Sequence, residues 1–105
     1  LGFPTANIRT ANEILPAGIF AARLQAGGRD LPALAYIGDR PTFAEKGMAV
    51  EVHALDFRGD LYGRTVRVAL LEKLRSDRAF PDAAALVRQM RRDEAAARAF
   101  LGRRP

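Results

Sequence analysis

The stretch GIFAARL, residues 18–24, predicts a β-strand, and the residues after it decide how the chain continues. Gly27-Gly28-Arg29-Asp30 supplies the positive φ angles that a tight hairpin turn needs. Residues 34–37 predict the returning strand, with Pro32 indicating an edge strand or a bulge near its start. The fold therefore begins with an antiparallel pair of strands.

Two further strands follow the loop over residues 38–47. They are AVEVHALDF at 49–57 and TVRVALL at 65–71, and both alternate apolar with polar residues. We expect them to pair with each other, because only a short glycine-containing connection separates them.

A helix is predicted from Asp82 to Leu101, where the apolar period changes from two to 3.6 residues. Asp82 is a good N-cap, and its charge suits the positive end of the helix dipole. The predicted apolar side holds Leu86, Val87, Met90, Ala97 and Leu101, and the opposite side holds Arg88, Arg91, Arg92 and Arg98. Short strands followed by one helix predict a mainly β fold, a small antiparallel sheet or barrel with the helix packed on it.

Length and composition limit the classes of protein. The chain has 105 residues, which fit one small domain (1–105), and it is 49% hydrophobic and 28% charged, as in ordinary globular proteins. It has no cysteine and one histidine, so a disulfide framework and a zinc site are excluded. No apolar run is long enough for a membrane span, and Leu1 to Asn7 lacks the basic start and long apolar core of a signal peptide. We therefore expect a cytoplasmic protein without a membrane partner. Because the first residue is Leu1, we interpret the chain as a piece of a longer protein.

The positive charge lies in the second half of the chain. Residues 1–57 hold five Lys/Arg and six Asp/Glu, whereas residues 58–105 hold twelve and six. Many of these arginines belong to the predicted helix, where acidic residues and alanines separate them. An RNA-binding barrel would need aromatic stacking residues beside them. We therefore expect a solvated helix face and no nucleic-acid partner.

GDLYGRT at 59–65 is the nearest approach to a phosphate-binding loop. It has three residues between its glycines instead of four, and Arg64 stands where a Walker loop requires lysine. Strands are predicted on both sides, whereas a Walker loop leads into a helix. The segment is interpreted as a connection between strands.

Six segments together resemble the riboflavin kinase family. Gly2 to Asn7 is similar to the family signature GxPTAN, and five more segments follow in the family's order, so that the resemblance runs from Leu1 to about Leu101. These five are LPAGIFA (15–21), IGDRPTF (37–43), VEVHALDF (50–57), GDLYG (59–63) and LRSDRAF (74–80).

This resemblance implies a fold and an activity. The family fold is a small antiparallel Greek-key β-barrel with a C-terminal α-helix, and family members carry a first strand ahead of the LGFPTAN segment that this chain lacks. The family transfers the γ-phosphate of ATP to the ribityl 5′-hydroxyl of riboflavin to give FMN. In bacteria the domain is commonly the C-terminal half of a bifunctional FAD synthetase, so an FMN adenylyltransferase domain is expected N-terminal to it.

The resemblance assigns Mg-ATP to the first segment. Thr5 and Asn7 are the expected magnesium and ATP contacts, and a hydroxyl and a carboxamide oxygen are hard ligands of the kind that Mg²⁺ prefers. Gly2 would let the backbone approach phosphate, and Pro4 would stiffen the loop. From the residues alone the alternative is a Pro-Thr turn followed by an asparagine cap.

Glu51 is the candidate catalytic base, as the resemblance implies. Strand alternation places it with His53, Leu55 and Phe57 on one face, and an apolar face should raise the pKa of a carboxyl, which suits a base. The alternative is a strand carboxylate paired with Arg67 across the predicted hairpin. His53 could support Glu51 but is not assigned a catalytic role.

By the same resemblance Arg75, Asp77 and Phe80 are the candidates for binding riboflavin or FMN, although Phe80 could also be a hydrophobic staple at the helix start. Tyr36 and Asp39 depart from the asparagine and threonine common in the family, and a negative charge near phosphates would weaken ATP binding unless Arg40 offsets it. The second hypothesis is therefore a non-catalytic flavin-binding barrel module.

Overall fold

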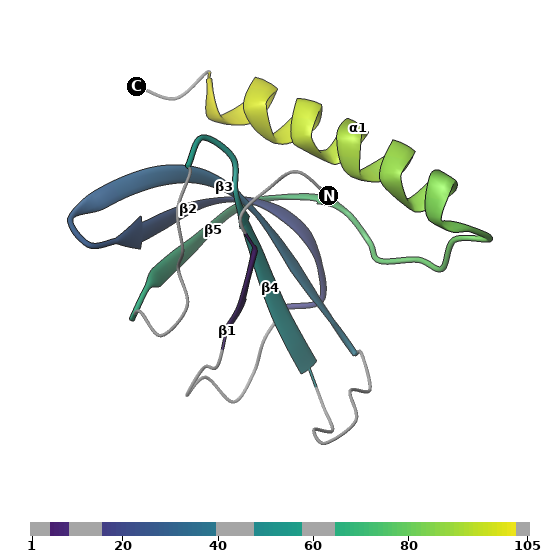
Figure 1. Ribbon diagram of the computed structural model, residues 1–105, viewed down its shortest axis with the longest axis horizontal. Helices are drawn as coiled ribbons and strands as arrows, with labels where there is room; N and C mark the ends of the chain where they lie inside the picture. Colours follow the sequence, from purple (N-terminus) through teal and green to yellow (C-terminus); the bar gives the residue numbers. More distant parts are fainter. Residues whose placement is uncertain (1–4, 9–15, 40–47, 58–64, 103–105) are drawn as a thin grey trace.

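The computed structural model describes residues 5–8, 16–39, 48–57 and 65–102. These residues form five antiparallel strands and one helix (Figure 1). They are β1 (Thr5–Ile8), β2 (Gly18–Ala26), β3 (Arg29–Asp39), β4 (Met48–Ala54), β5 (Arg67–Arg75) and α1 (Ala83–Leu101).

The strand order is β1-β4-β3-β2-β5. The consecutive strands β2, β3 and β4 are neighbours, and β5 returns to pair with β2, which is the Greek-key arrangement. The predicted antiparallel Greek-key fold with a C-terminal helix is confirmed. The predicted barrel is not found among the described strands, because their sheet is open, with β1 and β5 at its edges. The strand expected ahead of Leu1 lies outside the described residues.

The predicted pairing of residues 49–57 with 65–71 is wrong. β4 lies between β1 and β3 and therefore has no edge left for β5, which pairs with β2 instead. Arg67 accordingly lies opposite Gln25, and two strands, β2 and β3, separate it from the strand of Glu51. Alternation identified each strand correctly, but it does not specify which strands become neighbours.

The first predicted hairpin is confirmed at its turn. Gly27 and Gly28 connect β2 to β3 and have φ angles of 56° and 79°. Two consecutive positive φ values are the requirement of the two-residue turn that matches the twist of a β-hairpin.

β3 is longer than predicted, beginning at Arg29, and it is an interior strand. The inference from Pro32 of an edge strand or bulge is wrong, because the β2–β3 register continues through it without a shift. The Pro32 carbonyl accepts a hydrogen bond from the Leu55 N–H at 2.9 Å, and regular pairing with β4 begins one residue later, at Ala33. The N–H that proline lacks therefore falls at the end of that ladder.

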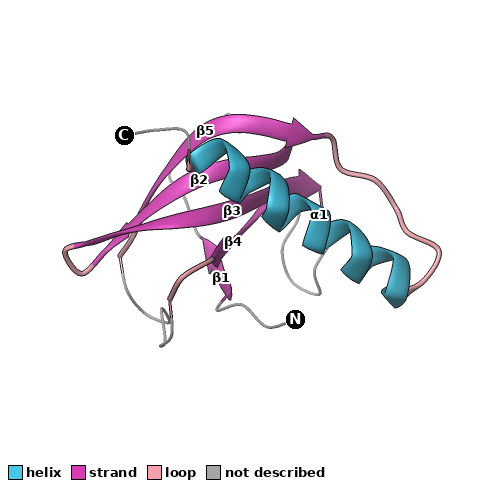
Figure 2. Cartoon of the chain, turned by 90° about the horizontal axis from the view of Figure 1, so that it is seen from above, coloured by secondary structure: helices cyan, strands magenta, loops and turns pink. Residues whose placement is uncertain are grey.

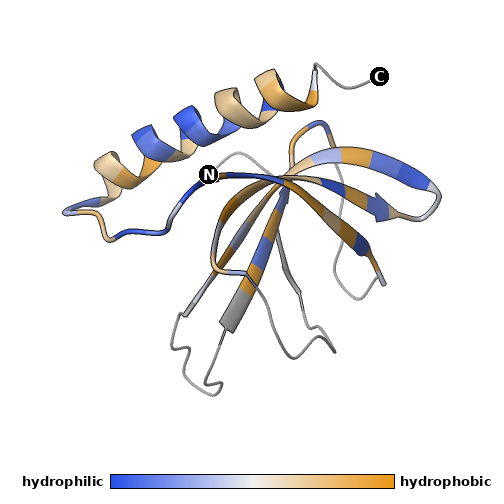
Figure 3. Cartoon of the chain, turned by 180° about the vertical axis from the view of Figure 1, so that it is seen from behind, coloured by the Kyte–Doolittle hydropathy of each residue, from blue (hydrophilic) through white to orange (hydrophobic). Residues whose placement is uncertain are grey.

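Buried apolar side chains form two clusters, one on each face of the sheet. Figure 3 shows the hydrophobic residues of the strands in orange. Along β2, Phe20, Ala22 and Leu24 belong to one buried cluster, whereas Ile19 and Ala21 belong to the other. Burial on both faces explains why the sequence of β2 is apolar at nearly every position.

Helix α1 lies across one face of the sheet and packs against β2, β3 and β5 (Figure 2). The Asp82 carboxylate caps it by accepting a hydrogen bond from the Ala85 N–H at 2.8 Å, as predicted. The predicted apolar side is confirmed for Met90, Ala97 and Leu101, which are buried, whereas Leu86 and Val87 are only partly buried. Asp93 is also buried and was not predicted. The described part of the chain holds no helix both long and apolar enough to cross a membrane.

Candidate active site

A pocket of about 510 Å³ lies between the sheet and the first half of α1. Five parts of the chain line it: strand β3, strand β4, the end of β5, the segment that follows β5, and the helix start. Its lining residues are Tyr36, Glu51, His53, Arg75, Asp77, Arg78, Ala79, Phe80, Asp82, Ala83, Leu86 and Met90. The predicted base and the three predicted flavin contacts are thus brought to one pocket.

Glu51 is held in the pocket wall by His53. The two residues are two positions apart on β4 and so share a face, and Glu51 Oε1 lies 2.6 Å from His53 Nε2. His53 is completely buried, whereas 31% of the Glu51 side chain is exposed. The carboxylate is therefore available to a ligand while its orientation is fixed by a rigid ring. The alternative pairing of Glu51 with Arg67 does not occur, because β5 lies beside β2.

The predicted face of β4 is correct as far as Leu55, one residue past the end of the strand. Leu55 packs in the cluster under the helix, as expected from alternation with His53. Phe57 instead packs against the opposite cluster, because β4 ends at Ala54 and a turn follows.

Tyr36 connects the Glu51–His53 pair to the helix. Its ring lies 4.9 Å from the His53 ring, centroid to centroid, and its hydroxyl donates to Asp93 Oδ2 at 3.2 Å. Burial and the neighbouring Asp93 carboxylate raise the pKa of the Tyr36 phenol, so it remains a hydrogen-bond donor.

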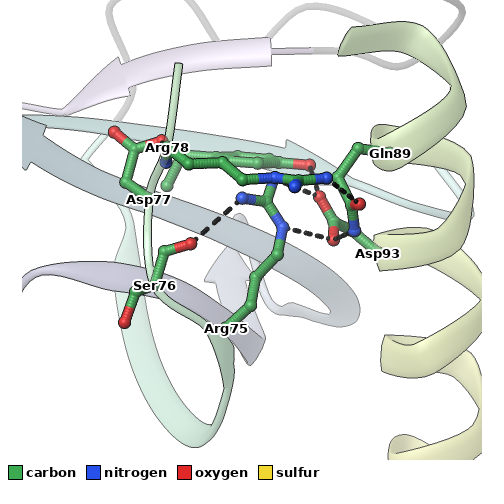
Figure 4. Close-up of polar contacts among 7 residues, drawn as sticks. Arg75, Ser76, Asp77, Arg78, Gln89 and Asp93 are labelled. Atoms are coloured by element: carbon green, nitrogen blue, oxygen red, sulfur yellow. Dashed lines mark hydrogen bonds and ion pairs between the residues drawn. The ribbon is translucent and has the colours of Figure 1, made fainter. Parts of the chain in front are cut away.

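Asp93 is 2% exposed and accepts four hydrogen bonds (Figure 4). Arg75 donates two of them at 2.7 Å, from Nε to Oδ1 and from Nη2 to Oδ2, and Gln89 Nε2 donates to Oδ1 at 3.0 Å. Burial alone would raise the pKa of Asp93, but the hydrogen bonds from Arg75, Gln89 and Tyr36 outweigh it and lower that pKa. The hydrogen bond to Asp93 raises the pKa of Arg75. The pair is therefore ionised at neutral pH.

Phe80 forms an aromatic wall of the pocket with cations beside it. The Arg78 guanidinium carbon lies 4.8 Å from the ring centroid and that of Arg75 lies at 5.7 Å. The Asp77 carboxylate lies close to the backbone of Gly38, where a Cβ atom would come within 2.9 Å of Oδ2. An apolar ring surrounded by a few polar groups is the usual chemistry of a site for a flat heterocycle.

The two predicted magnesium ligands belong to β1, next to the strand of the predicted base. Asn7 is the register partner of Glu51 and Thr5 is that of His53. Gly2 and Pro4 lie outside the described residues. Within the described ranges no cluster of three or more His, Cys, Asp and Glu side chains suits a metal ion.

Comparison with known proteins identifies the family of this chain. Residues 1–101 match the Flavokinase family, described as riboflavin kinase. The chain belongs to the riboflavin kinase family.

Curated members of this family match nearly the whole chain. The bifunctional riboflavin kinase/FMN adenylyltransferase of Escherichia coli (strain K12) is 42% identical over 104 residues, 97% of this chain and 33% of that protein. The protein of the same name from Pseudomonas fluorescens is 43% identical over 102 residues, 95% of this chain and 33% of that protein. The chain thus spans about a third of the length of these relatives.

A solved structure shares the fold as well. The crystal structure of a macrolide-efflux protein from Streptococcus pneumoniae matches with a TM-score of 0.82 and 31% identity, over 92% of this chain and 33% of that one.

Sequence reasoning missed the polar residues behind the pocket, Asp93 and Gln89. A signal for Asp93 was present, because it lies three residues after Met90 and four before Ala97, within the apolar stripe of a 3.6-residue period. A charged residue at such a position is buried only with a partner. The partner, Arg75, could not be identified from spacing.

Proposed function

We propose that this domain transfers the γ-phosphate of ATP to the ribityl 5′-hydroxyl of riboflavin, giving FMN and ADP. Membership of the riboflavin kinase family supports the reaction. The observation that carries the assignment of roles is that Glu51 shares one pocket with Phe80, Arg75 and Asp77. A proton acceptor and a site for a flat ring therefore lie in one cavity.

In this proposal Glu51 is the catalytic base. The acceptor oxygen attacks the γ-phosphorus, the bond to the bridging oxygen of ADP breaks, and the proton of the hydroxyl passes to the Glu51 carboxylate. His53, which is buried 2.6 Å from Glu51 Oε1, holds the carboxylate in place. Phosphoryl transfer requires mainly that the reacting groups are held in the correct positions. The contact between Glu51 and His53 on β4 holds the proposed base in this way.

Thr5 and Asn7 are proposed to bind Mg-ATP, with Gly2 and Pro4 in the same segment. Their hydroxyl and carboxamide oxygens are suitable for Mg²⁺, and β1 lies beside β4, which carries Glu51. Bound magnesium would neutralise charge on the β- and γ-phosphates. The nucleotide is thereby assigned to the β1 side of Glu51, and riboflavin to the side of Arg75, Asp77 and Phe80.

We also propose the setting of this domain. The relatives are about three times as long as this chain, and their names include an FMN adenylyltransferase. Residues 1–105 would then be the kinase domain of a bifunctional FAD synthetase, with the adenylyltransferase domain N-terminal to it. Its substrates, ATP and riboflavin, fit a cytoplasmic location and require no nucleic-acid or membrane partner.

The test is FMN formation from riboflavin and Mg-ATP by the purified protein. Glu51→Gln keeps the size and a hydrogen-bonding oxygen but loses the base, so we expect a fall of about 10²- to 10⁴-fold. Glu72→Gln is the matched control, since Glu72 is an exposed glutamate on β5 that does not line the pocket, and it should retain full activity.

The same assay separates the kinase from the non-catalytic flavin-binding module. Binding of riboflavin without FMN formation in the folded wild-type protein would exclude the kinase and favour that module. Full activity in Glu51→Gln would leave the reaction standing and remove Glu51 from its role.

A further inference from the structure

Two residues of α1 lie behind the pocket wall without lining it. Gln89 and Asp93 are four residues apart, and Gln89 Nε2 donates to Asp93 Oδ1 at 3.0 Å. We call Gln89 and Asp93 the helix pair. Nothing in the proposed reaction uses them directly, yet Asp93 is a buried carboxylate, which is costly unless it is fully hydrogen-bonded.

Arg75 and Arg78 flank Phe80. Each member of the helix pair anchors one of these arginines (Figure 4). Asp93 binds Arg75 through both carboxylate oxygens, and the Gln89 carbonyl oxygen accepts a hydrogen bond from Arg78 Nη2 at 3.0 Å. Arg75 comes from the end of β5 and Arg78 from the segment after it, so the helix pair connects this segment to α1.

These contacts fix side chains that would otherwise move freely. Arginine has many rotamers, and a two-point contact with a carboxylate selects both its position and its plane. The segment from Ser76 to Phe80 forms no regular secondary structure, so its side chains depend on such contacts for their orientation. The arrangement of two cations around the Phe80 ring thus depends on residues that do not line the pocket.

We propose that Asp93 and Gln89 are positioning residues that set the affinity for riboflavin by fixing Arg75 and Arg78 around Phe80. This inference rests on the proposed function for the identity of the ligand. It predicts that the helix pair controls riboflavin binding and leaves Mg-ATP binding, assigned to the β1 side of Glu51, nearly unchanged.

Riboflavin affinity, followed by quenching of flavin fluorescence, and the KM for Mg-ATP provide the test. For Asp93→Asn we expect riboflavin binding at least tenfold weaker, and for Gln89→Met about threefold weaker, with the Mg-ATP KM changed less than twofold. Asp56→Asn is the control, because Asp56 also binds an arginine of α1, Arg98, at 2.9 Å, but at the other end of the helix and outside the pocket. It should bind riboflavin as the wild type does.

Each outcome bears on the proposal. If Asp93→Asn does not fold, Gln89→Met decides, because it leaves the Arg75–Asp93 pair intact. A folded Gln89→Met or Asp93→Asn variant with wild-type riboflavin affinity would overturn the positioning role and leave the kinase assignment untouched. A folded wild-type protein that binds no riboflavin would instead overturn the proposed function, together with the ligand named here. Equal losses for riboflavin and Mg-ATP would show a general structural effect and also overturn the proposal.

Discussion

Removing the charge of Asp93 should be one of the most destabilising conservative changes in the protein. The Asp93 carboxylate is 2% exposed and Arg75 is 16% exposed, and two hydrogen bonds of 2.7 Å join them. Breaking a buried ion pair from one side costs about 3–5 kcal/mol, because the remaining charge stays buried. Arg75 retains some contact with solvent, so the lower end, about 3 kcal/mol, applies to Asp93→Asn.

Urea denaturation at pH 7 measures the free energy of unfolding that Asp93→Asn loses. For a domain of this size, about 3 kcal/mol also corresponds to a fall in Tm of at least about 12 °C. Asp56→Asn removes the Arg98–Asp56 pair, whose carboxylate side chain is 59% exposed, and solvent screening limits that loss to less than about 1 kcal/mol. A loss below about 1 kcal/mol for Asp93→Asn would refute the reasoning, because Arg75 would then be well solvated without its partner.

Further changes test other parts of the structure. Since the pKa of Asp93 is lowered, its stabilisation is complete above the ordinary carboxyl pKa of about 3.9 and is lost as the pH falls through the folded value; Asp93→Asn should therefore flatten the decline in urea midpoint on acidification. Gly38→Ala should displace the Asp77 carboxylate, which lies 2.9 Å from the new Cβ, and weaken riboflavin binding several-fold while costing less than about 1 kcal/mol, because an exposed side chain can move. Leu34→Ala, in the fully buried layer under α1, should cost about 2–5 kcal/mol in the same denaturation experiment. Asp82→Ala removes the helix N-cap and should cost about 1 kcal/mol, whereas an unchanged Tm would show that the cap bond contributes nothing.

The elements of this fold could be predicted because their signals are local. The glycine pair at 27–28 specified a turn, and the change of period at Asp82 specified the start of a helix, and the structure has both. The neighbours of each strand could not be predicted in this way. Whether β5 pairs with β4 or with β2 depends on the edges that remain after β1 and β3 have occupied β4, which is a property of the assembled sheet.

The candidate site also combines local features that could be predicted with contacts between distant elements that could not. The face shared by Glu51 and His53 followed from alternation along one strand, and the structure adds the contact between them. The contacts of Asp93 with Arg75 and Tyr36 join a helix to two strands, over separations of 18 and 57 residues. No periodic pattern in the sequence predicts such contacts, so they can be identified only in the folded structure.

The position of α1 over the pocket has a consequence for how the domain is made. Strand β3, which carries Tyr36, and strand β4, which carries Glu51, leave the ribosome early, whereas the helix that covers the pocket is the last described element of the chain. A nascent chain that has completed only its strands therefore has the proposed base but lacks the helix side of the pocket. Ligand binding stabilises only the form that can bind it. Riboflavin would thus stabilise the finished domain and give no such support to a chain that ends before residue 82.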